Sequence, residues 1–269
     1  MTASPILIES IELNARLGDT YLQLVDLCTA EQYACGHIPG AVHLDYPRLI
    51  LSRPPVMGLL PGADYMRELF GSLGLRPDAY IVAYDDEGGG HAARLLWSLV
   101  AYGHTCYGLL NGGLQAWVNE GFALDATLIA PTPNDYPVTY NPEVIAEYDY
   151  IAARLDNPDV KLLDCRSPQE YRGDDKRTAR AGHIPGASNM EWTQTMDATR
   201  SLRLKPSETL LSTFAAAGVT RDREVITYCQ THHRSAHTWL VLKALGFERV
   251  RGYPGSWSEW GNRNDTPID

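Results

Sequence analysis

The feature that most constrains the fold of this chain is an internal repeat. The hexapeptide GHIPGA occurs at residues 36–41 and again at 182–187, an offset of 146. Two further segments recur in the same order: YDDEGGGHAARLLW resembles YCQTHHRSAHTWLV, and LLNGGLQAWVNEG resembles GYPGSWSEWGN, at offsets of 144 and 143. Because three segments repeat in order at a nearly constant offset, the 269 residues indicate a duplicated domain.

A proline-rich segment separates the two copies. Four prolines fall between residues 131 and 142. Proline has no backbone N–H and interrupts both helices and central strands, so the segment is predicted to be an extended, semi-rigid linker. We therefore predict a first domain at residues 1–125, a linker at 126–142 and a second domain at 143–269.

Within each copy, strand-like runs alternate with helical patterns. The first copy has predicted strands at 23–27, 80–85 and 106–110, and predicted helices at 65–74 and 92–103. The second copy has predicted strands at 161–165, 224–229 and 249–253, and predicted helices at 208–218 and 237–246. This alternation predicts an α/β fold in which each domain is a parallel sheet flanked by helices on both faces. Ligands of such sheets bind at the carboxyl ends of the strands.

The composition disfavours several classes of function. The formal net charge is -10, which provides no electrostatic attraction to nucleic acid or to anionic lipid. No apolar run approaches the roughly 20 residues that span a membrane. The first residues lack a basic segment followed by an apolar one, so we expect no signal peptide and a cytoplasmic location.

The five cysteines are odd in number, scattered and without a CxxC pair. In a reducing compartment this pattern argues against a disulfide framework and against structural zinc. We interpret Cys28, Cys35, Cys106 and Cys165 as structural or incidental, which leaves Cys229. Nothing in the sequence implies a metal or an organic cofactor, and we expect a monomer.

Cys229 ends a β-branched run and begins a short loop that leads into a helix. The N-terminus of a helix presents unpaired N–H groups and a partial positive charge, and a short loop adds further N–H groups to form an anion nest. Both effects favour the thiolate form of a cysteine placed there. Arg234 adds a permanent charge, and Ser235 is predicted to be the N-cap of the helix. The segment is therefore predicted to hold a reactive thiolate.

The first copy serves as an internal control. Its loop reads DDEGGG where the second reads CQTHHR, so that Asp85 replaces Cys229. This loop has three acidic residues, no cation and no thiol, and we expect that it does not build an anion-binding cup. We predict that the first domain is the inactive copy and the second the catalytic one.

These residues together resemble the tandem-domain rhodaneses, and the loop is similar to that of a bacterial subgroup with the sequence CQTHHR. The resemblance rests on the two GHIPGA turns, the CQTHHRS loop and the segments DCRSPQEYRG and GSWSEWGN, and it extends from about Ile6 to Pro267. It implies transfer of a sulfane sulfur from a small anionic donor, thiosulfate, to cyanide or a thiol through a persulfide on Cys229. It also implies these substrate-binding residues in the loop: Gln230, Thr231, His232, His233, Arg234 and Ser235.

The loop differs from those of better-known rhodaneses. It contains no lysine, and Glu170 stands at the position that matches a substrate-binding arginine in vertebrate members. The identity of the donor is therefore open, with 3-mercaptopyruvate as the alternative to thiosulfate. Arg166 is a further candidate for anion contact, with a structural salt bridge as its other interpretation. Trp192 is a candidate for the wall of the pocket or for core packing.

Three other functions are alternatives for this loop, and its length disfavours the first of them. A phosphatase or arsenate reductase of related fold would need five residues between its cysteine and arginine, whereas four separate Cys229 from Arg234. A metal site could use Cys229 with three nearby histidines: His232, His233 and His237. A sulfur carrier would accept its persulfide from a partner protein and would not turn over a small donor.

Overall fold

The computed structural model describes residues 5–269, and contacts divide these into two compact units. Unit 1 comprises the described residues up to Leu49 together with Pro61–Asn141 and Met196–Leu204. Unit 2 comprises Ile50–Leu60, Pro142–Thr195 and Lys205–Asp269. Each unit therefore takes most of its residues from one copy of the repeat and one short segment from the other.

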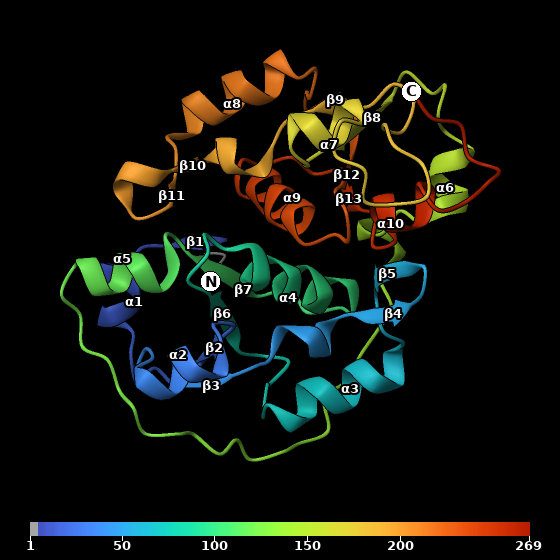
Figure 1. Cartoon of the computed structure of the whole chain (residues 1–269). Helices are drawn as coiled ribbons and strands as arrows, with labels where there is room; N and C mark the ends of the chain where they lie inside the picture. Colours follow the sequence, from blue (N-terminus) through green and yellow to red (C-terminus); the bar gives the residue numbers. More distant parts are fainter. Residues whose placement is uncertain (1–4) are drawn as a thin grey trace. The chain divides into compact units, whose positions relative to one another are not determined.

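Unit 1 is built on a parallel sheet with the strand order β1-β7-β6-β2-β3. Its strands are β1 (Leu7–Ile8), β2 (Leu22–Asp26), β3 (Ala41–His43), β6 (Tyr80–Tyr84) and β7 (Tyr107–Leu110). Its helices are α1 (Ser10–Ala15), α2 (Ala30–Cys35), η1 (Tyr46–Leu49), α3 (Ala63–Ser72), α4 (Gly90–Ala101) and α5 (Gly113–Asn119). Figure 1 shows α1 and α2 on one side of this sheet and α3 and α4 on the other.

Unit 2 repeats this plan with the parallel strand order β13-β12-β8-β9. Its strands are β8 (Val160–Asp164), β9 (Ser188–Asn189), β12 (Glu224–Tyr228) and β13 (Val250–Gly252). Its helices are η2 (Pro142–Val144), α6 (Tyr148–Ala152), α7 (Pro168–Arg172), η3 (Trp192–Thr195), α8 (Ser207–Ala216), α9 (Arg234–Ala244) and α10 (Ser256–Trp260). Figure 1 shows α8 and α9 on one side of the sheet and α6 on the other.

The predicted fold class is confirmed, because both sheets are parallel and flanked by helices. The central strands are buried on both faces, which explains their continuous apolar sequences: all five residues of β6 are buried. Every predicted long strand and helix is present. The sequence did not predict the two-residue strands β1 and β9, whose pairing depends on the neighbouring strand and not on their own residues.

Two hairpins lie in the unit formed mainly by the other copy. The first consists of β4 (Leu51–Arg53) and β5 (Val56–Leu59) and packs in unit 2, where the Met57 N–H donates to Ser258 Oγ at 3.0 Å. The second consists of β10 (Met196–Asp197) and β11 (Arg203–Leu204), with the short helix η4 (Ala198–Arg200) between them, and packs in unit 1. The division at 1–125, 126–142 and 143–269 describes the repeat in the sequence and stays a prediction. The compact units differ from this division because each contains one hairpin from the other copy of the repeat.

The proline-rich segment follows the surface of unit 1 without helix or strand from residue 126 to 141. Its Asn134 and Thr139 N–H groups donate to the carbonyls of Gly71 and Tyr102, at 3.0 and 3.1 Å. Its Tyr136 is 1% exposed, and the hydroxyl lies 2.7 Å from His104 Nδ1. The segment thus has neither helix nor strand over residues 126–141, and it is held against unit 1.

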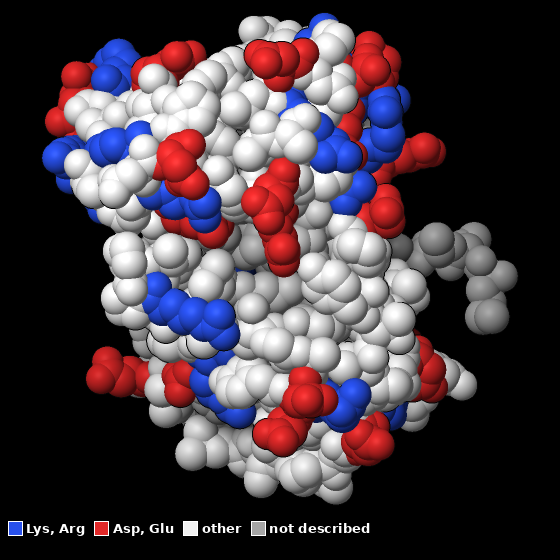
Figure 2. Space-filling model, turned by 90° about the vertical axis from the view of Figure 1, so that its right-hand side faces the viewer, with Lys and Arg blue, Asp and Glu red and all other residues white. Residues whose placement is uncertain are grey.

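None of the helices in residues 5–269 combines the length and the hydrophobicity that a membrane crossing requires. On the face drawn in Figure 2, lysine and arginine side chains lie among aspartate and glutamate side chains. The acidic net charge of -10 is therefore accompanied by mixed charge on this face.

Candidate active site

Cys229 directly follows strand β12, and the loop that it begins leads into helix α9. The first turn of α10 braces the backbone of this loop. The Cys229 N–H donates to Ser256 Oγ at 3.3 Å, and the Cys229 carbonyl accepts the Trp257 N–H at 2.9 Å. The Gln230 carbonyl likewise accepts the Ser258 N–H at 3.0 Å. These bonds fix the loop at the carboxyl end of the sheet, where ligands of parallel sheets bind.

The Cys229 thiol is surrounded by groups that favour its anion. Burial works to raise its pKa, since the residue is only 1% exposed. The positive charge of Arg234 and hydrogen bonds from the Ser235 hydroxyl, the Ser235 N–H and the Thr231 N–H work in the other direction. They outweigh the burial, and the pKa of Cys229 is lowered. The loop and the start of α9 therefore form the anion nest predicted from the sequence.

The predicted role of Ser235 as N-cap is wrong. Helix α9 begins at Arg234 with His233 as its N-cap, so Ser235 lies inside the first turn. In the turn that precedes the helix, His232 adopts a left-handed backbone conformation with φ 55. This places the Ser235 hydroxyl 2.7 Å from His232 Nδ1 and beside the Cys229 sulfur.

Arg234 forms a bidentate ion pair with Glu170 of α7. Its Nη1 and Nη2 donate to the two carboxylate oxygens at 2.6 and 2.8 Å, and Glu170 is 2% exposed. Burial works to raise the pKa of Glu170, but the hydrogen bonds and charge of Arg234, the Ser167 N–H and the charge of Arg177 lower it to about 2. Arg234 therefore acts on Cys229 through its charge, and a donor anion would have to share its terminal nitrogens with Glu170.

The remaining loop residues line the same segment. Gln230 is half-buried, and its Oε1 has no hydrogen-bond partner among the described residues. His232 is fully buried, whereas Thr231 and His233 are half-buried. The structure thus brings all six predicted loop residues to the N-terminal end of α9, with Thr231 and Ser235 in contact with the sulfur.

Arg166 and Trp192 have different surroundings. Arg166 is 1% exposed, donates to Asp164 Oδ2 at 2.5 Å and to the Gly182 carbonyl at 2.8 Å, and lies over the Trp257 ring. These contacts favour the interpretation of Arg166 as a structural salt bridge. Trp192 is half-buried, and its ring centroid lies 5.7 Å from that of His233. Trp192 therefore packs beside a loop residue.

The equivalent loop of unit 1 corrects one expectation. The Asp85 carboxylate accepts N–H groups from Glu87, Gly89 and Ala92 at 3.1, 2.7 and 3.0 Å, so an anion nest is built here as well. The aspartate itself occupies this nest and is fully buried. Burial and the charge of Glu87 raise the pKa of Asp85 to about 6, against the opposing effect of the three N–H groups. The first copy retains the cup and fills it with its own side chain.

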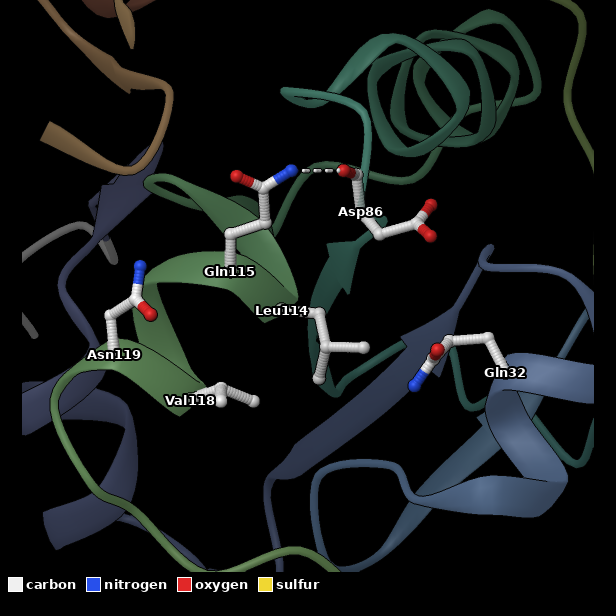
Figure 3. A pocket seen from close by; sticks show the side chains of 6 residues that line it. All are labelled: Gln32, Asp86, Leu114, Gln115, Val118 and Asn119. Carbon is white, nitrogen blue, oxygen red and sulfur yellow. Dashed lines mark hydrogen bonds between the residues drawn. The ribbon is translucent and has the colours of Figure 1, made fainter. Parts of the chain in front are cut away.

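Unit 1 contains an open pocket near this loop, which Figure 3 shows with six lining side chains. The pocket is lined by Gln32, Asp86, Leu114, Gln115, Val118 and Asn119. Gln115 Nε2 donates to the Asp86 carbonyl at 2.8 Å. In the repeat, Gln32 occupies the position of Glu170 and Leu114 that of Trp257. The uncharged Gln32 thus replaces one partner of the ion pair of unit 2, and the smaller Leu114 replaces the Trp257 indole.

The sequence interpretation missed two supports of the loop. The pairing of Glu170 with Arg234 was not predicted, although Glu170 was noted. A comparison of the two copies could have indicated it, because the first copy has Gln32 in place of Glu170 and Gly90 in place of Arg234. The sequence interpretation also missed Gly58 of the β4–β5 hairpin, whose added Cβ would lie 2.6 Å from Thr231 Cβ. No local pattern could have identified this contact, because 173 residues separate the two positions.

Comparisons with known proteins agree with this architecture. The model of the rhodanese-like domain family matches residues 10–120 and 147–263. The thiosulfate sulfurtransferase of Pseudomonas aeruginosa is 49% identical over 98% of this chain and 97% of its own length. The sulfur carrier protein TtuD of Thermus thermophilus is 36% identical over 88% of this chain and 86% of its own. The structure of an anaerobic ergothioneine biosynthesis enzyme from Chlorobium limicola shares the fold, with a TM-score of 0.88 at 22% identity over 98% of this chain and 70% of that one.

Proposed function

This chain belongs to the rhodanese-like domain family, and on that premise we propose that it is a thiosulfate:cyanide sulfurtransferase. The observation that carries the proposal is the lowered pKa of the buried Cys229 thiol in its nest of N–H groups. In the first half-reaction, the thiolate attacks the outer sulfur of thiosulfate. A sulfur–sulfur bond forms, and sulfite leaves with the electron pair of the bond that breaks. The product is a persulfide on Cys229.

In the second half-reaction, cyanide or a thiol attacks the terminal sulfur of the persulfide. This releases thiocyanate or a new persulfide and restores the Cys229 thiolate. The Thr231 and Ser235 N–H groups would stabilise the anionic sulfur in both halves of the cycle. Arg234 would supply the positive charge, and Gln230, His232 and His233 would line the approach of the donor. Trp192 would form a wall beside His233, and Arg166 would hold the end of β8.

An intact-mass spectrum tests this proposal directly. We expect the wild-type protein to gain one sulfur atom on addition of thiosulfate and to lose it on addition of cyanide. The variant Cys229→Ala should gain none. If Cys229→Ala gains sulfur as well, another cysteine carries the reaction. If the wild-type protein gains none, thiosulfate is not the donor.

A persulfide carrier, or a 3-mercaptopyruvate sulfurtransferase, is the second candidate. It is favoured by the pairing of Arg234 with Glu170, which makes the one permanent cation of the loop less available to a doubly charged donor. Rates of Cys229 loading from thiosulfate, 3-mercaptopyruvate and a persulfidated protein would separate the candidates. If competition between Glu170 and thiosulfate for Arg234 weakens the binding of thiosulfate, Glu170→Gln should lower the KM for thiosulfate. The expected decrease is about tenfold, which corresponds to the free energy of one charge-assisted hydrogen bond. An unchanged KM would remove this support for the second candidate.

We extend the proposal to the location, the oligomeric state and the domain division of the protein. We infer that it acts as a cytoplasmic monomer without nucleic acid, and that residues 1–125 and 143–269 are the repeated domains, joined by 126–142. Light scattering after size exclusion would test the monomer. Chymotrypsin cleaves after leucine and tyrosine, and Leu128 and Tyr140 are exposed within residues 126–142. Stable fragments that end at either residue would support the division.

A further inference from the structure

We propose that Cys165 and Cys229 form a redox pair in which the Cys165 thiol resolves the Cys229 persulfide when no acceptor is present. The products are a Cys165–Cys229 disulfide and hydrogen sulfide. The persulfide in this step rests on the proposed function, whereas the pairing of the two thiols rests on the geometry of unit 2 alone. The two cysteines are the only ones in that unit by sequence.

Both cysteines stand at the carboxyl ends of neighbouring strands. Strands β8 and β12 pair in parallel as far as Asp164 and Tyr228, and each cysteine is the next residue of its strand. The ladder continues past that pair, since the Cys165 N–H donates to the Tyr228 carbonyl at 2.8 Å. Neighbouring strands lie about 4.8 Å apart. This separation is within the roughly 4.4–6.8 Å between Cα atoms that a disulfide requires.

The two side chains also face the same helix. The Cys229 sulfur accepts hydrogen bonds from Ser235, and the Cys165 sulfur interacts with the Thr238 side chain. Ser235 and Thr238 are three residues apart on α9 and therefore share one face of it. The positive charge of Arg234 acts on both thiols, and the charge of Cys229 acts on Cys165. The sulfurs thus lie on one side of the sheet.

Packing alone does not require a thiol at position 165. In the repeat, the equivalent residue is Leu27, which is 1% exposed and follows β2 as Cys165 follows β8. The first copy thus places leucine beside Asp85, and the second places cysteine beside Cys229. A second thiol is present in the copy that has a nucleophilic one.

The resolving step needs no external oxidant. The Cys165 thiolate attacks the inner sulfur of the persulfide, the Cys229 Sγ, and a new sulfur–sulfur bond forms. The bond from Cys229 Sγ to the outer sulfur breaks, and the outer sulfur leaves with the electron pair. The outer sulfur keeps the persulfide proton, leaves as HS⁻ and takes up the proton that Cys165 gave, so it is reduced to hydrogen sulfide. Cys165 is oxidised, and the Cys229 Sγ stays at the oxidation level that it had in the persulfide. Burial raises the pKa of Cys165 well above its ordinary value, which makes this step slow compared with transfer to an acceptor.

The test follows the persulfide after the donor is removed under anaerobic conditions. In wild type we expect intact mass to show loss of the added sulfur together with two hydrogens, and one equivalent of hydrogen sulfide to be released. In Cys165→Ser and Cys165→Leu the persulfide should last at least about tenfold longer and release no sulfide. The control variants Cys35→Ser and Cys106→Ser should behave as wild type. Equal persistence in wild type and both Cys165 variants would overturn the resolving step.

A second arm separates this inference from the proposed function. Diamide is added to the reduced protein without any sulfur donor, and peptides are mapped under non-reducing conditions. A Cys165–Cys229 linkage would support the pair even if thiosulfate fails to load Cys229. If persulfide forms but diamide yields no such linkage, the pair is wrong although the proposed function stands. A linkage that appears only between two molecules, and disappears on dilution, would also contradict the pair.

Discussion

At the scale of single residues, the chemistry of this protein is decided by how the Cys229 sulfur is surrounded. Burial disfavours the thiolate, and a short list of hydrogen bonds together with one positive charge more than compensates for it. The same backbone loop in unit 1 surrounds a carboxylate instead. One fold element thus holds either a reactive or an inert anion, and the side chain at the end of the strand determines which.

The pH dependence of alkylation measures this balance. Because the pKa of Cys229 is lowered, the rate with iodoacetamide should reach half its maximum at a lower pH than for an ordinary, unperturbed thiol. Ser235→Ala removes one donor to the sulfur and should raise this midpoint by about one pH unit. The control is Ser212→Ala, at an exposed serine of α8. A midpoint that does not move in Ser235→Ala would mean that the hydroxyl does not stabilise the thiolate.

The ion pair of Glu170 predicts a loss of stability in acid. The folded-state pKa of Glu170 is about 2, and that of a glutamate in the unfolded chain is about 4.3. A carboxylate with a depressed pKa stabilises the fold above its unfolded pKa. This contribution, of about 3 kcal/mol, is lost as the pH falls from about 4.3 to about 2.

Urea unfolding from about pH 6 down to about pH 2.5 checks this contribution. Glu170→Gln should show a smaller change in the free energy of unfolding over this range than wild type. Glu208→Gln, at an exposed carboxylate of α8, should retain the wild-type change. Equal slopes for wild type and Glu170→Gln would show that the pair does not depress the pKa of Glu170.

At the scale of elements, the β4–β5 hairpin supports the reactive loop from a distant part of the chain. Besides the bond from Met57, the Ser258 hydroxyl donates to the Met57 carbonyl at 2.7 Å, and Ser258 in turn holds the Gln230 carbonyl. Gly58 abuts Thr231, whose N–H donates to the Cys229 sulfur. The hairpin therefore contacts the loop directly at Thr231 and supports it indirectly through Ser258 of α10.

A pair of glycine variants tests this support. Gly58 and Gly186 both have positive φ, 80 and 75, so alanine strains the backbone by about 1 kcal/mol at either site. Only at Gly58 would the new Cβ meet Thr231, whereas Gly186 has open space within 4 Å. We expect Gly58→Ala to slow Cys229 alkylation at neutral pH and to raise its midpoint, and Gly186→Ala to change only the free energy of unfolding. The same alkylation profile for both variants would contradict this role of the hairpin.

At the scale of the whole molecule, the repeat and the compact units do not have the same boundaries. Unit 2 includes residues 50–60, which the sequence assigns to the first domain. Residues 143–269 expressed alone would therefore lack part of the unit that holds Cys229. We expect this fragment to transfer sulfur at least about tenfold more slowly than the full chain. A synthetic peptide of residues 50–60 should restore part of the rate in an assay of thiocyanate formation, and a scrambled peptide should not. Full activity of the fragment alone would show that the hairpin is dispensable.

The long elements and the position of the nucleophile could be predicted because they depend on neighbouring residues. A continuous apolar run specifies a buried strand such as β12, and a cysteine between such a strand and a helix must lie at the mouth of a nest of N–H groups. The duplication also allowed one copy to be compared with the other, which singled out Cys229 over Asp85.

The sequence by itself determined two parallel α/β sheets, their order along the chain and the thiol at the end of one strand. Only the tertiary structure decided the pairing of Arg234 with Glu170, the filling of the first nest by Asp85, the placement of both hairpins and the juxtaposition of Cys165 with Cys229. The physical reason is the range of the interactions. Hydrophobic periodicity and backbone geometry act between near neighbours, whereas charge pairing and steric contact depend on which distant segments the fold brings within a few ångströms.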